Sequence, residues 1–173
     1  HGARKILLTD ITYIPFKDGF CYLSVIKDAY TEQVLSYVLS ESLEVDFVLE
    51  TVKQLIKNHG DTLKPDTIIH SDQGCHYTSV GFRELLSDYN LRQSMSRKGN
   101  CWDNAPQESF FGHMKDELKI KKGKWKNYDD IKQSIDDWMD YYNNDRGQWL
   151  LEKMSPNEFY QYTKTGINPL LAG

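Results

Sequence analysis

Residues 5–14 read KILLTDITYI, an apolar and β-branched run that holds a single acid, Asp10. This composition predicts a β-strand, in which successive side chains point to opposite faces. Asp10 then shares one face with Ile6 and Leu8. Because aspartate is depleted in strands and costly to bury alone, Asp10 is paired with a basic residue, placed past the point where the strand is covered, or part of a functional site.

Two further strand-like runs follow, at residues 20–27 (FCYLSVIK) and 33–40 (QVLSYVLS). Their short connectors predict an antiparallel meander of three strands. Over residues 44–58 the apolar period changes to three and four, which predicts an amphipathic helix that stops at Gly60.

The second half of the chain alternates between strands and helices. Residues 96–105 (SRKGNCWDNA) are rich in turn formers and predict a loop, and Pro106 suits the first position of the helix after it. Strands are expected at 67–70 and 91–95, and helices at 78–88, from 106, at about 128–143 and from 155. The order predicts an α/β fold, a mixed sheet with helices on both faces. We expect a single domain over 1–173, with a C-terminal helical extension of about 128–161.

The composition does not identify the class of molecule that the protein binds. The chain has 173 residues, is 39% hydrophobic and carries a net charge of −4. DNA affinity comes mostly from Lys and Arg, so the net charge argues mildly against a general DNA binder. Residues 115–126 (KDELKIKKGKWK) nevertheless hold six lysines against two acids, and the partner class stays open.

Cysteine and apolar patterning exclude several classes. The 3 cysteines are widely spaced without a C-x-x-C, which fits neither a disulfide framework nor a zinc module. The apolar runs are far shorter than the ~20 residues of a membrane helix. We therefore expect a cytoplasmic protein with no membrane partner and no small-molecule cofactor, and the first residue, His1, suggests that further domains precede it.

Two more acids occupy positions at which functional residues are often found, the end of a strand and the start of a helix. Asp72 ends the strand at 67–70, and the carboxyl ends of strands are where open sheets place ligands, although a turn-forming aspartate before Gly74 is equally ordinary. Glu108 opens the helix after Pro106, where the helix dipole alone favours an acid by roughly 0.3–1 kcal/mol.

Together, Asp10, Asp72 and Glu108 have the chemistry of a metal site. Carboxylates suit Mg²⁺ or Mn²⁺, and two such ions about 4 Å apart can activate an attacking oxygen and stabilise a leaving one at a phosphodiester. The three acids therefore predict a metal-dependent polynucleotidyl transferase.

Several separated motifs carry a resemblance to a known family. They are TDITYI at 9–14, HSDQG at 70–74 with Tyr77, NCWDNAPQESFF at 100–111, YYNNDR at 141–146 and MSPNEF at 154–159. In order and spacing, including the 35 residues 73–107 between the second and third acids, they resemble the catalytic (integrase-core) domain of insertion-sequence transposases. These belong to the DDE superfamily that includes retroviral integrases, and the most similar group makes its transposase by frameshifting.

The resemblance implies an RNase H-like fold with a five-stranded sheet ordered 3-2-1-4-5. It implies that Asp10, Asp72 and Glu108 are the catalytic and metal-binding acids and hold two Mg²⁺ (or Mn²⁺) ions when DNA is bound. The implied reaction is DNA cleavage to a 3′-OH and transfer of that end into target DNA, by a homo-oligomer at the bacterial nucleoid. Two departures are Trp102, where Tyr is common, and Gly147-Gln148, where many relatives have Pro-His.

Basic and aromatic residues near the acids are candidate DNA contacts. Lys115 lies seven residues after Glu108, on the same helix face, and Lys119 four further is expected to lean the same way. Arg97, Lys98 and Trp102 on the loop are candidates for phosphate contact and base stacking. Two alternatives remain open, namely another RNase H-like nuclease and a non-catalytic DNA-binding descendant.

Overall fold

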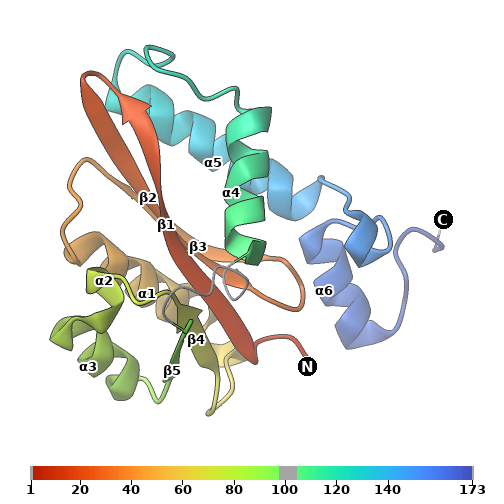
Figure 1. Ribbon diagram of the computed structural model, residues 1–173. Helices are drawn as coiled ribbons and strands as arrows, with labels where there is room; N and C mark the ends of the chain where they lie inside the picture. Colours follow the sequence, from red (N-terminus) through yellow and green to blue (C-terminus); the bar gives the residue numbers. More distant parts are fainter. Residues whose placement is uncertain (1, 98–104, 173) are drawn as a thin grey trace.

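One mixed sheet organises the chain, as the computed structural model shows for residues 2–97 and 105–172 (Figure 1). Its strand order is β3-β2-β1-β4-β5, with β1 to β3 antiparallel and β4 and β5 parallel to β1. The strands are β1 (Ile6–Phe16), β2 (Gly19–Asp28), β3 (Val34–Ser40), β4 (Ile68–Ser71) and β5 (Arg92–Met95). The predicted meander and strand order are confirmed.

Helices cover both faces of this sheet, as predicted. Figure 1 shows α1 and α3 packed on one side, and α4 and α5 on the other. The helices are α1 (Asp46–His59), α2 (Cys75–Thr78), α3 (Val80–Asp88), α4 (Ala105–Glu117), α5 (Tyr128–Asn144) and α6 (Pro156–Thr165), with short 3₁₀ turns η1 (Gly60–Thr62) and η3 (Trp149–Leu151). Within the described ranges, none of these helices has the length and apolarity needed to cross a membrane.

The alternation of strand side chains divides the apolar residues into two cores. Leu7 and Ile26 face α1 and α3, whereas Ile14, Leu23 and Val25 face α4 and α5. Each fully buried aliphatic side chain contributes about 1.5–3 kcal/mol relative to an exposed one. The sheet is therefore held on both sides, and α5 is anchored by a stripe at helical spacing: Ile131, Ile135, Trp138, Met139 and Tyr142.

Two local features differ from the expectations. β1 runs through Pro15 to Phe16, two residues beyond the run 5–14 that predicted it. β4 pairs with Ile6–Leu8 only. Among the residues that the structure describes, the far end of β1 therefore has β2 as its one strand neighbour, and Pro15 can lie there without donating a hydrogen bond. The short helix α2 was not predicted, since four residues show no period.

The core beneath α5 gives a stability prediction. Ile135 is 0% exposed, so Ile135→Ala should lower the free energy of unfolding by about 2–5 kcal/mol, through lost burial and a cavity. Urea denaturation measures this. Ile167→Ala, at a site 65% exposed, is the control and should stay within about 0.5 kcal/mol of the wild type. Equal effects of the two changes would contradict the packing described here.

Candidate active site

The parallel pairing of β1 with β4 fixes where two of the three acids lie. Leu8 pairs with His70, and two residues further along each chain stand Asp10 and Asp72. Neighbouring strands lie about 4.8 Å apart, so this register brings the two aspartates level at the carboxyl end of β4. Both carboxylates also help to raise the pKa of the Tyr77 hydroxyl, a group that lies within the electrostatic reach of each. The structure thus brings Asp10 and Asp72 together.

Backbone N–H groups orient both aspartates. The Ile11 amide donates to Asp10 Oδ1 at 2.8 Å, and the Gly74 amide donates to Asp72 Oδ1 at 2.7 Å. A Cβ at residue 74 would stand only 2.8 Å from Asp72 Oδ1, so glycine permits this close turn. Each half-buried carboxylate is therefore held in a defined direction by its own loop or strand.

Glu108 lies on the exposed side of the first turn of α4. Its neighbour Gln107 is buried, and Gln107 Nε2 donates to the Leu8 carbonyl oxygen at 3.4 Å. Leu8 precedes Asp10 by two residues and shares its face of the sheet, so the start of α4 is held beside the aspartate pair. Figure 1 shows the lower end of α4 next to β1.

Within residues 2–97 and 105–172, no three His, Cys, Asp or Glu side chains are grouped closely enough to hold a metal ion. Asp10 and Asp72 stand at matching positions beyond the paired residues of β1 and β4, and together with Glu108 they do not form such a group. Like charges disfavour the close approach of a third carboxylate. The donor chemistry fits a hard divalent cation, because all three candidate groups are carboxylates.

Three buried polar side chains lie near the aspartates, and sequence reasoning did not single them out. The hydroxyls of Thr9 and Tyr77 and Oε1 of Gln107 are buried without a well-formed hydrogen bond in the described part of the chain. Burial, followed by Asp10 and Asp72, raises the Tyr77 pKa well above its ordinary value, and the neighbouring Thr9 hydroxyl acts in the opposite direction. The available signal was a polar residue, Gln107, placed three before the core residue Phe110.

The structure places the predicted DNA-contacting residues in different surroundings. Exposed Arg97 follows Ser96, whose amide donates to the Ser71 carbonyl at 2.8 Å, so Arg97 lies beside the Asp72 loop. Lys115 is partly buried on α4, and burial lowers its pKa. Lys98 and Trp102 lie outside the described residues.

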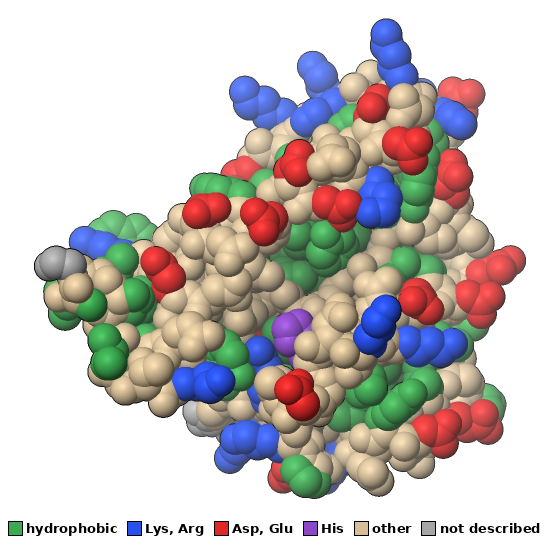
Figure 2. Space-filling model, turned by 180° about the vertical axis from the view of Figure 1, so that it is seen from behind, with side chains coloured by type: hydrophobic (Ala, Val, Ile, Leu, Met, Phe, Trp, Pro, Cys, Tyr) green, Lys and Arg blue, Asp and Glu red, His purple; other side chains and the backbone are tan. Residues whose placement is uncertain are grey.

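The expectation that helical spacing carries Lys119 onto the Glu108 face is wrong. Helix α4 ends at Glu117, and Lys119 has a left-handed backbone with φ 51°. It belongs instead to the connection between α4 and α5, whose exposed lysines are Lys121, Lys122, Lys124 and Lys126. Figure 2 shows Lys and Arg side chains gathered at one end of the molecule, with acidic side chains below them.

The histidines near Asp72 make hydrogen bonds to neighbouring elements. His70 Nδ1 and Nε2 lie 3.0 and 3.1 Å from the hydroxyls of Ser94 and Ser96, which connect β4 with β5. His76 Nε2 lies 2.6 Å from the Leu43 carbonyl oxygen. These rings are thus committed to hydrogen bonds that join neighbouring elements.

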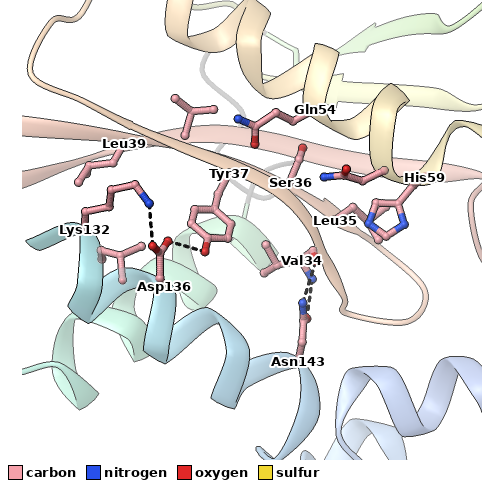
Figure 3. A pocket seen from close by; sticks show the side chains of 13 residues that line it. Val34, Leu35, Ser36, Tyr37, Leu39, Gln54, His59, Lys132, Asp136 and Asn143 are labelled. Atoms are coloured by element: carbon pink, nitrogen blue, oxygen red, sulfur yellow. Dashed lines mark hydrogen bonds and ion pairs between the residues drawn. The ribbon is translucent and has the colours of Figure 1, made fainter. Parts of the chain in front are cut away.

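A cavity of about 500 Å³ lies on another part of the molecule, at the β3 edge between α1 and α5 (Figure 3). Asn143 occupies part of this edge: its Oδ1 accepts from the Val34 amide at 2.9 Å, and its Nδ2 donates to the Val34 carbonyl at 2.8 Å. The Tyr37 hydroxyl donates to Asp136 at 2.7 Å. Strands β2 and β1 separate this edge from β4, so the cavity is distinct from the acidic site.

Comparison with known proteins identifies the class. Two profiles described as "Integrase core domain" match residues 1–101 and 89–156. An uncharacterized transposase-like protein of Haemophilus influenzae is 36% identical over 148 residues, covering 86% of this chain and 67% of that protein. The putative transposase InsK for insertion sequence element IS150 of Escherichia coli is 33% identical over 156 residues, covering 90% of this chain and 54% of the relative.

Solved structures agree with this fold. The simian T-cell lymphotropic virus intasome has a chain that matches with a TM-score of 0.78 and 16% identity, covering 96% of this chain and 57% of that one. The HTLV-2 integrase catalytic core in complex with magnesium matches with a TM-score of 0.68 and 16% identity, covering 91% and 95%.

The chain belongs to the integrase core domain family. Its sequence relatives are transposases of insertion sequences, and its fold is that of retroviral integrase cores, which confirms the predicted RNase H-like transposase core. It spans between about half and two thirds of the length of the curated relatives named here.

The buried Tyr77 hydroxyl gives a prediction that runs against the usual cost of core substitutions. Tyr77→Phe should raise the free energy of unfolding by about 1 kcal/mol, because it removes a buried hydroxyl that has no well-formed hydrogen bond within residues 2–97 and 105–172. The matched control is Tyr142→Phe, which removes a hydroxyl that donates to the Glu32 carbonyl at 3.0 Å and should cost about 1 kcal/mol. Chemical denaturation of both variants decides, and a loss of stability in Tyr77→Phe would show that its hydroxyl is satisfied.

Proposed function

We propose that this chain is the catalytic domain of a DNA transposase and a polynucleotidyl transferase that cleaves and joins DNA strands. The observation that carries the proposal is the β1–β4 register, which sets Asp10 level with Asp72 while Gln107 holds the Glu108 turn beside the same strand. The proposed domain is a single core over 1–173, with α5 and α6 as its C-terminal extension.

The catalytic acids of the proposal are Asp10, Asp72 and Glu108. They would hold Mg²⁺ or Mn²⁺, with two ions when DNA is bound, and the magnesium in the HTLV-2 integrase core supports this choice. Bound ions would supply activation of the attacking oxygen and stabilisation of the leaving one. The protein's own contribution is to fix two carboxylates through the Ile11 and Gly74 amides and to present the third from a helix N-terminus.

DNA is the proposed substrate, as both element ends and target. Arg97 beside the Asp72 loop and Lys115 on α4 are proposed phosphate contacts, with Lys98, Trp102 and Lys119 as further candidates. A homo-oligomer on DNA is supported by the intasome and by the dimeric HTLV-2 core among the related folds.

Substitution of the acids tests the proposal. Asp10→Asn, Asp72→Asn and Glu108→Gln should each reduce Mg²⁺-dependent cleavage of duplex DNA by more than about 100-fold, since changes outside the ligand set already cost ten- to a hundredfold. Asp18→Asn, at the exposed β1–β2 turn, is the control and should keep wild-type activity. Retention of full activity in any of the three variants removes that residue from the site. Cleavage without joining of a 3′-OH end would favour the RNase H-like nuclease.

Phosphate contact by Arg97 and Lys115 predicts a change in salt dependence. Arg97→Ala and Lys115→Ala should each weaken DNA binding across unrelated sequences and lower the slope of log K against log salt by about 1. Fluorescence anisotropy over a salt series measures this. Lys57→Ala, at an exposed position of α1, should leave the slope as it is, and an unchanged slope in the Arg97 and Lys115 variants would make them ordinary surface residues.

A further inference from the structure

The first turn of α4 has one fully buried side chain, that of Gln107, which is 0% exposed between the exposed Pro106 and Glu108. The apolar anchors of the helix begin a turn later, at Phe110 and Met114. Core packing thus fixes the body of α4, whereas the turn that bears Glu108 depends on Gln107.

The hydrogen-bond partner of Gln107 lies on β1, close in sequence to Asp10 and paired with the strand that leads to Asp72. Gln107 Nε2 donates to the carbonyl oxygen of Leu8, and Leu8 pairs with His70 on β4. Leu8 lies two residues before Asp10, and His70 two residues before Asp72. One side-chain contact therefore connects the Glu108 turn to the place where both aspartate-bearing strands are in register.

Packing alone does not account for an amide at this position. Gln107 Oε1 is buried and has no hydrogen-bond partner among the residues that the structure describes. A buried amide oxygen without a partner costs free energy, whereas methionine would fill the same volume without that cost. The amide gives the helix something that an apolar side chain lacks, which is a directional bond to β1.

We propose that Gln107 is a positioning residue, which sets the direction from which Glu108 approaches Asp10 and Asp72 through its bond to Leu8. This role rests on the proposed function of the three acids. It requires that loss of the bond weaken cation binding without weakening the fold.

Gln107→Met tests this role, because it keeps the length of the side chain and removes the bond. Its thermal midpoint without metal should equal or exceed that of the wild type. The Mn²⁺ concentration at half-maximal thermal stabilisation should rise about tenfold. Amides of residues 109–111, which bond to first-turn carbonyls in an α-helix, should exchange hydrogen faster, while those of 114–117 should not change. Gln133→Met, an exposed glutamine on α5, is the matched control and should alter neither measurement.

The outcomes separate this role from the proposed function. If Mn²⁺ does not shift the thermal midpoint of the wild type, or shifts that of Asp10→Asn equally, the proposed function is overturned and this role with it. A normal Mn²⁺ response that is unchanged in Gln107→Met overturns the positioning role alone. Weaker Mn²⁺ binding with unchanged exchange at 109–111 also overturns it, because Gln107 would then act without holding the helix turn.

Discussion

The parallel pairing of β1 with β4 is the constraint on which the site depends. Three residues of each strand are paired, yet this short ladder fixes the register of two distant acids. A slip of one residue would turn Asp72 to the opposite face of the sheet from Asp10, because side chains alternate along a strand. The α1 and α3 core beneath Leu7 and Ile69 resists such a slip, since both side chains are fully buried there.

The third acid is held by a different kind of contact. Glu108 arrives on a helix, and the helix is fixed mainly by apolar packing that starts one turn beyond it. This arrangement leaves the acid exposed, while the buried polar groups of Gln107, Thr9 and Tyr77 lie behind the site. Buried polar groups near the acids cost folding free energy compared with apolar side chains. They also surround the carboxylates with dipoles, which can stabilise charge during a reaction.

Sequence patterning predicted the repetitive elements well because their causes are local. The period of three and four around Ile131 and Ile135 predicted α5 almost to its observed ends, and the short β-branched runs predicted all five strands. Sequence patterning predicted less where contacts with neighbouring elements determine the local structure. Pro15 could remain in β1 because, in the described part of the chain, that end of the strand has no second partner strand. Lys119 left the expected helix face because the chain turns after Glu117.

The sequence by itself determined the fold class, the family and the identities of the three candidate acids, because periodicity and motif order are properties of the linear chain. Only the tertiary structure decided that Asp10 and Asp72 stand level across one strand pair, and that Gln107 reaches the Leu8 carbonyl. Register and helix docking depend on contacts between residues 60 to 100 positions apart. No local pattern contains such contacts, because they form only when both sides of the sheet are packed.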